Sequence, residues 1–212
     1  VNHQYGRHNL DLYSLAIHGD YIYGWGYQDG TQGPGILVKH DINGNEIWRE
    51  SATDKSTVEG FSAEDISISS DGSVYVVGST RGEDSSGWGI REFNDQSIPN
   101  FGSREGFIIK YDSTGNREWT KLTGHYVYSL EIGDNDSIYI SGINQAGNQF
   151  ISSFNSEGDL ITSEEFSSIE DINTQSIQDL TVSSDGSILF TGGSSKGTSY
   201  LAKYSRNLSY SW

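Results

Sequence analysis

The densest group of oxygen-bearing side chains in the sequence is the turn GDNDS, from Gly133 to Ser137. Asp134, Asn135 and Asp136 are candidate ligands for Ca²⁺, a cation that takes about six to eight oxygen ligands. The turn lacks the D-x-D-x-D-G pattern and the distant Glu of a complete calcium loop, so a solvated hairpin turn is the alternative interpretation. Ca²⁺ is therefore the one cofactor that the sequence suggests.

Two further turns carry an Asp in the same register. KHDINGNEIW runs from Lys39 to Trp48, and KYDSTGNREW runs from Lys110 to Trp119. The Asp and Asn side chains of such a stretch can accept and donate hydrogen bonds to the backbone, and its Gly can adopt a positive φ. The pattern predicts a structural turn, and calcium binding by Asp41 and Asp112 is the alternative.

A second candidate site is the stretch STRGEDSSGWGIREFNDQSIPNFGSREG, from Ser79 to Gly106. It gathers aromatic and arginine side chains, the types that dominate interface hot spots. The candidate binding residues are Trp88, Arg91, Phe93, Phe101 and Arg104. They predict a protein or carbohydrate partner. In the alternative, the stretch folds back and its aromatic residues cover a sheet edge or a channel.

Recognisable catalytic patterns are missing from the sequence. The five His residues show no H-E-x-x-H spacing, there is no G-x-S-x-G elbow and no P-loop, and there is no Cys. The pair Glu164 and Glu165 could serve glycoside chemistry only if the fold brought a further carboxylate across a cleft. We therefore expect a non-enzymatic protein.

Composition restricts the partners. The chain has 13 basic and 29 acidic residues and a formal net charge of -16, which would repel a phosphate backbone or an anionic membrane surface. No apolar run approaches the roughly 20 residues of a membrane-spanning helix. We expect neither nucleic-acid binding nor membrane insertion, and an extracellular or cell-surface location.

The elements that must position these residues follow from an internal repeat. One half of each unit is LAIHGDYIYGWG from Leu15, ISISSDGSVYVVG from Ile66, LEIGDNDSIYISG from Leu130 or LTVSSDGSILFTG from Leu180. The other half is the stretch from Ile36, Phe107, Gln149 or Tyr200 that leads into the Asp-containing turn or its degraded form. Each half alternates apolar and polar residues on both sides of a turn, which is typical of a β-hairpin.

Four strands per unit, repeated four times, predict an all-β fold: a β-propeller built of four-stranded antiparallel blades. We expect one domain over residues 1–212, with units at about 13–54, 64–124, 127–168 and 177–212. The second unit is longer than its neighbours, and the surplus lies between its second and third strands. In a propeller such loops share a face with the connections between blades.

The repeated D-x-x-G-N-x-x-W, preceded by S-x-D-G-S-x-Y-V-x-G, resembles the SBBP repeat of bacterial β-propeller proteins. Those proteins are often secreted, so the resemblance implies a propeller outside the cytoplasm. It implies no particular activity, because propellers host many functions.

Together these features predict a structural or binding module that presents loops on one face. The alternative is a Ca²⁺-dependent or enzymatic propeller with a site at the channel mouth. Four units allow a closed four-bladed ring, a part of a larger chain, or a homo-oligomer in which two chains complete one ring.

Overall fold

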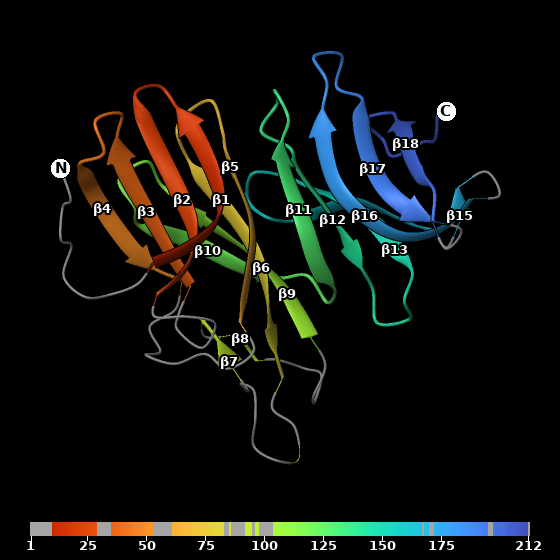
Figure 1. Cartoon of the computed structure of the whole chain (residues 1–212), viewed down its shortest axis with the longest axis horizontal. Helices are drawn as coiled ribbons and strands as arrows, with labels where there is room; N and C mark the ends of the chain where they lie inside the picture. Colours follow the sequence, from red (N-terminus) through yellow and green to blue (C-terminus); the bar gives the residue numbers. More distant parts are fainter. Residues whose placement is uncertain are drawn as a thin grey trace.

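The protein is an all-β propeller of four blades, as the repeat predicts. The computed structural model describes residues 10–28, 35–52, 61–82, 85, 92–94, 96–97, 104–166, 168–169, 172–194 and 197–211. Each blade is an antiparallel sheet (Figure 1). None of the described residues form a helix able to cross a membrane.

Blades 1 to 3 each contain four consecutive long strands. Blade 1 comprises β1 (Leu10–His18), β2 (Tyr21–Gln28), β3 (Gly35–Asp41) and β4 (Glu46–Ser51). Blade 2 comprises β5 (Ser62–Ile68), β6 (Val74–Arg81), β9 (Arg104–Tyr111) and β10 (Arg117–Leu122). Blade 3 comprises β11 (Tyr126–Ile132), β12 (Ile138–Ile143), β13 (Gln149–Phe154) and β14 (Leu160–Phe166). The extra residues of the second unit lie between β6 and β9 and include the small hairpin of β7 (Glu92–Phe93) and β8 (Gln96–Ser97).

Blade 4 departs from the predicted order. Its strands are β15 (Ser168–Ile169), β16 (Ile172–Val182), β17 (Ile188–Ser194) and β18 (Ser199–Tyr204), and the short β15 pairs with the start of β16. Where the repeat predicts a last strand, the described residues form one bridge between Tyr204 and Tyr210 and a hydrogen bond from Ser211 N to Lys203 O. Three long strands therefore form most of this blade.

The repeated Asp-containing turns are held by their own side chains. Asp112 Oδ1 accepts hydrogen bonds from Thr114 N (2.8 Å) and Asn116 N (2.9 Å), and Asn116 Nδ2 donates to Asp112 Oδ2 (2.9 Å). These hydrogen bonds, first those of Asn116, hold the pKa of Asp112 well below its usual value. Gly115 has a φ of 96°, the positive region that favours glycine. The D-x-x-G-N pattern is thus a turn signature, as predicted.

Neighbouring blades bury apolar side chains against each other. One core lies between blades 1 and 2 and includes Trp25, Leu37 and Phe107, with Trp48 packed against it. A second core lies between blades 2 and 3, with Trp119 packed against it. A third core lies between blades 3 and 4. Both tryptophans of the clear repeat motifs, Trp48 and Trp119, therefore lie between blades.

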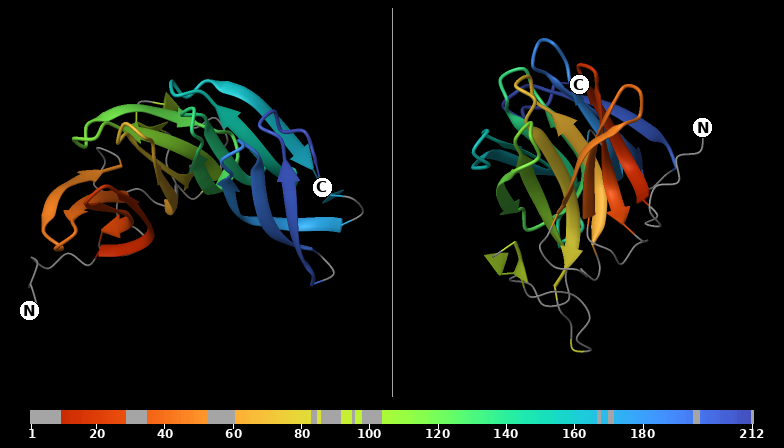
Figure 2. Two further views of the ribbon diagram at one scale, coloured as in Figure 1. Left: turned by 90° about the horizontal axis from the view of Figure 1, so that it is seen from above. Right: turned by 90° about the vertical axis from the view of Figure 1, so that its left-hand side faces the viewer.

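The blades follow an open arc (Figure 2). Strand β1 contacts β5, β5 contacts β11, and β11 contacts β16, so the first strands of successive blades lie side by side along the inner wall. Among the described strands, none of blade 1 packs against a strand of blade 4, so the ring is open in this structure.

The first long strand of each blade contains a β-bulge, and in blades 1 to 3 a glycine of the second strand accommodates it. The register shifts between Leu12 and Ser14, Ala63 and Asp65, Val127 and Ser129, and Ile177 and Asp179. A Cβ on Gly26, Gly78 or Gly142 would lie 2.0, 2.1 or 1.9 Å from a carbonyl oxygen of the first strand. In blades 1 to 3 the glycine that ends the motif therefore allows the two backbones to approach.

Gly142→Ala is expected to lower the free energy of unfolding by about 3 kcal/mol, because the added methyl group overlaps the Tyr126 carbonyl. Chemical denaturation measures this loss. Gly147→Ala is the control: its Cβ meets open space and only its φ of 87° resists alanine, so about 1 kcal/mol is expected. Equal losses in the two variants would show that the bulge does not require glycine.

Candidate active site

The inner wall carries one polar side chain directly after each bulge. These residues are Ser14, Asp65, Ser129 and Asp179, one from each blade. We call them the inner belt. They link the blades: Ser14 Oγ donates to Asp65 (2.8 Å), and Ser129 Oγ lies 3.2 Å from a carboxylate oxygen of both Asp65 and Asp179.

Asp65 is the most connected member of the belt. Its Oδ1 accepts from Ile66 N (2.8 Å) and its Oδ2 accepts from Leu130 N of the next blade (2.9 Å). Burial raises the pKa of Asp65, and these hydrogen bonds oppose the shift without cancelling it. The backbone amides freed by the bulges are thus satisfied by carboxylate oxygens, which is a structural role.

Glu131 lies next to the belt on β11. Burial, followed by the charges of Asp65 and Asp179, raises the pKa of Glu131 to about 7. A carboxyl group with such a pKa can take up or release a proton near neutral pH. The inner wall therefore has a titrating group as well as a structural network.

Glu131→Gln is expected to stabilise the protein by about 1 to 2 kcal/mol at pH 8, a value reduced for partial solvent screening. The folded pKa of about 7 lies above the ordinary glutamate value of 4.5, so the stabilising contribution of the protonated Glu131 is present below pH 4.5. It is lost as the pH rises through 7. Denaturation at several pH values measures the change, with the exposed Glu157→Gln as control. A variant with the same pH dependence as the parent would contradict the assignment.

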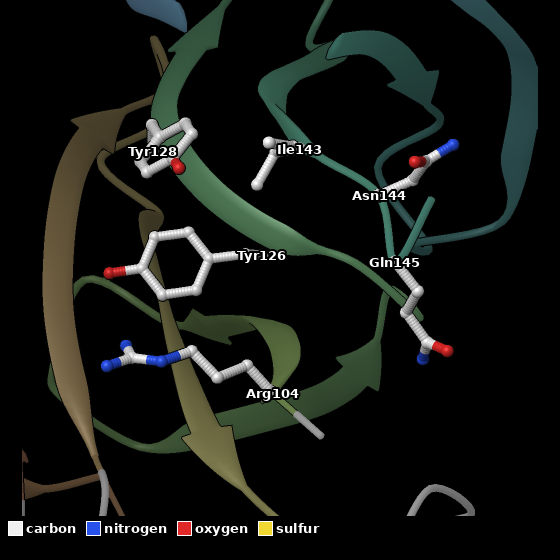
Figure 3. A pocket seen from close by; sticks show the side chains of 6 residues that line it. All are labelled: Arg104, Tyr126, Tyr128, Ile143, Asn144 and Gln145. Carbon is white, nitrogen blue, oxygen red and sulfur yellow. The ribbon is translucent and has the colours of Figure 1, made fainter. Parts of the chain in front are cut away.

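A cavity of about 560 Å³ lies at the start of β11, between blades 2 and 3. It is lined by Arg104, Tyr126, Tyr128, Ile143, Asn144 and Gln145 (Figure 3). Arg104 begins the third strand of blade 2, and Asn144 and Gln145 follow the second strand of blade 3. The cavity is therefore on the face of the loops between second and third strands.

The cavity is lined by two phenols and a guanidinium group, and one of the phenols is hydrogen-bonded to a carboxylate. Tyr126 donates its hydroxyl hydrogen to Glu64 Oε1 at 2.5 Å, and Glu64 is the bulged residue of β5. The Arg104 guanidinium lies 4.9 Å from the centroid of the Tyr126 ring, and the rings of Tyr126 and Tyr128 lie 4.8 Å apart. Figure 3 shows Arg104, Tyr126 and Tyr128 one above another along one wall.

Burial is the main cause of the raised pKa values of both tyrosines. For Tyr126 the hydrogen bond with Glu64 raises the pKa further, and for Tyr128 the Glu64 charge does so, while Arg104 opposes both shifts. Both phenols are neutral hydrogen-bond donors at neutral pH as a result. A carboxylate in such a place can act as a general base, and the neighbouring phenols and guanidinium can stabilise a developing negative charge.

The predicted binding residues do not all meet in this cavity. Arg104 lines it, whereas Phe93 is fully buried and stacks on Phe107 with ring centroids 4.8 Å apart. Phe93 thus packs into the core between blades 1 and 2, in agreement with the alternative in which loop aromatics cover a blade. Trp88, Arg91 and Phe101 lie outside the described residues. A binding role for this set stays a prediction.

The sequence did not single out Glu64, Tyr126, Tyr128, Asn144 or Gln145. Glu64 and Tyr128 are the extra residues of their bulges, so the period-two pattern hides their direction. The signal that could have identified Glu64 and Tyr128 is their shared position in the repeat. The residues one position before the inner belt are Tyr13, Glu64, Tyr128 and Gln178.

The predicted calcium ligands lie in the turn between β11 and β12. Asp134 and Asn135 are exposed, and Asp136 has a φ of 57° and donates its backbone N–H to Gly133 O. Across the described part of the chain, no group of three or more His, Asp or Glu side chains is arranged to hold a metal ion. The turn contains only two carboxylates and the third candidate ligand is an amide, so calcium binding there stays a prediction.

The fold is similar to that of solved enzyme structures. A gluconolactonase from Xanthomonas campestris, XC5397, matches with a TM-score of 0.52 and 12% identity over 90% of this chain and 57% of its own. A putative gluconolactonase, a structural genomics target, matches with the same TM-score and identity over 90% of this chain and 58% of its own. The chain thus spans less than two thirds of either. No family model and no curated protein matches the sequence.

These similarities correct one expectation from the sequence. Both neighbours are named for an enzymatic activity, and this finding contradicts the prediction of a non-enzymatic structural or binding module. At 12% identity the likeness itself shows the shared propeller fold. The prediction was wrong because it rested on the absence of short sequence motifs, and the cavity residues come from separate strands.

Proposed function

We propose that the protein is a hydrolytic propeller that opens a small, hydroxyl-rich lactone or ester in the cavity between blades 2 and 3. The observation that carries the proposal is the grouping of the half-buried Glu64 and Tyr126 with the exposed Arg104 beside one cavity. A carboxylate, a neutral phenol and a guanidinium are the groups that ester hydrolysis needs.

In this proposal Glu64 is the general base. It takes a proton from a water molecule whose oxygen attacks the substrate carbonyl carbon. The carbonyl oxygen becomes negatively charged, and Arg104 and the Tyr128 hydroxyl stabilise that charge. When the carbonyl re-forms, the ring C–O bond breaks and the leaving oxygen recovers the proton from Glu64. Tyr126 holds the Glu64 carboxylate in place through its hydrogen bond.

The lining of the cavity supports a sugar-like substrate. Tyrosine rings offer apolar faces to C–H groups, and the Asn144 and Gln145 side chains lie on the opposite wall, where amides can bind hydroxyl groups (Figure 3). The gluconolactonase names of the two neighbours support the lactone class. Gluconolactonase is the name of the longer neighbours, and lactone hydrolysis by this chain is our proposal.

Two finer assignments belong to the same proposal. The repeats are of the SBBP type, supported by the D-x-x-G-N-x-x-W stretches at Asp41–Trp48 and Asp112–Trp119. The protein acts outside the cytoplasm, supported by its net charge of -16 and by the secreted proteins that carry this repeat.

The test is hydrolysis of a panel of aldonolactones, simple δ-lactones and neutral aryl esters, followed by acid release. The panel is run once with Ca²⁺ and once with a chelator. We expect turnover of hydroxylated lactones above the uncatalysed rate and less turnover of aryl esters. Rates equal to the uncatalysed rate for every compound in both conditions would refute the proposal.

A further inference from the structure

The outer face of blade 1 is built like the buried side of an interface. Leu15 and Ile17 of β1 are 64% and 71% exposed. The residues that occupy the position of Leu15 in the other blades are Ile66, Leu130 and Leu180, and each is at most 5% exposed because it packs on the preceding blade. Blade 1 therefore presents the side that, elsewhere in the molecule, a preceding blade covers.

The outer face of blade 4 resembles the other side of the same kind of interface between blades. Leu201 is 53% exposed, whereas the residues in its position, Leu37, Ile108 and Ile151, are fully buried against the following blade. Leu189 and Leu201 line a small hollow of about 80 Å³ on this face, with Asp179 at its inner side. Blade 4 therefore presents the side that a following blade covers elsewhere.

The inner belt indicates which blade would follow. Serine and aspartate alternate along it in the order Ser14, Asp65, Ser129, Asp179, and each Asp lies beside the serine of the preceding blade. Asp65 Oδ2 also accepts Leu130 N of the following blade, whereas no described residue donates to Asp179 Oδ2. The residue that continues the alternation after Asp179 is a serine, as Ser14 of a second copy would be.

We propose that the protein associates head to tail with a second copy, the outer face of blade 4 packing on the outer face of blade 1 of its partner. The interface repeats the three interfaces inside the chain. Figure 2 shows the two end blades at opposite ends of an open arc, so two copies meeting twice bring eight blades into one ring, within the usual range for propellers. The proposal rests on the blade faces and not on the proposed function.

The test is the mass of the purified chain in solution, by light scattering and analytical ultracentrifugation over a wide range of concentration. We expect twice the mass of one chain for the parent and a single-chain mass for Leu15→Glu and for Leu201→Glu, because each variant lacks one half of every interface. Mixing the two variants should restore a dimer held by one intact interface, in which the unaltered blade 4 of Leu15→Glu packs on the unaltered blade 1 of Leu201→Glu. Asp179→Ala should raise the dimer dissociation constant by about tenfold or more.

Several outcomes would overturn the proposal. A parent that stays a single chain at every concentration would show that another occupant, such as a further segment of a longer chain, covers these faces. A dimer that persists in Leu201→Glu alone would mean that identical faces pair. The control is Ile42→Glu, an exposed apolar residue in the turn after β3, which should stay dimeric. Circular dichroism confirms that each variant is folded.

Discussion

Glu64→Gln is expected to lower kcat/KM for lactone hydrolysis at least about a hundredfold, because the amide cannot accept a proton from water. KM should change little, since the side chain keeps its shape and can still accept the hydrogen bond from Tyr126. The measurement is the steady-state rate on the best lactone of the panel. This is the largest effect that we expect on activity.

The matched control is Glu157→Gln, which makes the same change in an exposed turn of blade 3. It should leave kcat/KM unaltered. Tyr126→Phe removes the hydrogen bond that positions Glu64 and should lower kcat less than Glu64→Gln does. Full activity in Glu64→Gln, with the fold intact, would exclude Glu64 as the base.

Asp65→Ala is expected to lower the free energy of unfolding by about 3 to 4 kcal/mol, the largest loss of stability among the single changes considered. The substitution leaves the amides of Ile66 and Leu130 without their carboxylate acceptor and separates Ser14 from blade 2. Urea denaturation measures this loss.

Asp179→Ala is the comparison, because Asp179 has the same position in blade 4, is exposed and has no following blade in the chain. At a protein concentration too low for association its loss should be below about 1 kcal/mol. Similar losses for the two variants would show that the contacts of Asp65 with the following blade do not explain its contribution to the free energy of unfolding.

Much of the fold follows from the sequence because the repeat is written in local patterns. The turns after Lys39 and Lys110 are stabilised within five residues by Asp and Asn, so their structure needs no distant partner. The alternation on both sides of each turn then gives hairpins, and hairpins that leave two apolar faces must stack as blades.

In blade 4 the local sequence pattern does not account for the structure of the last turn. Its last turn has Ser205 in place of Asp and Leu208, with a φ of 59°, in place of Gly. The side chain of Leu208 is buried in the core between blades 3 and 4, so tertiary packing holds a conformation that the residue type disfavours. Such compensation depends on distant residues and could not be read from the repeat.

The cavity could not be predicted for a similar reason. Glu64 and Tyr126 lie 62 residues apart, and only the contact between β5 and β11 brings them together. The direction of the Glu64 side chain depends on a bulge, and the alternating pattern carries no information about a residue that interrupts it. Arg104 was predicted as a binding residue from its type, while its partners required the fold.

The most direct test of the active site is a crystal structure of the protein with D-gluconate, the acid that opening of a gluconolactone releases. We predict that the acid binds in the cavity, with its carboxylate near Arg104 and its hydroxyl groups toward Asn144 and Gln145. Binding of the acid elsewhere, for example beside Glu131 on the inner wall, with the Arg104 cavity empty of ligand, would contradict the assignment.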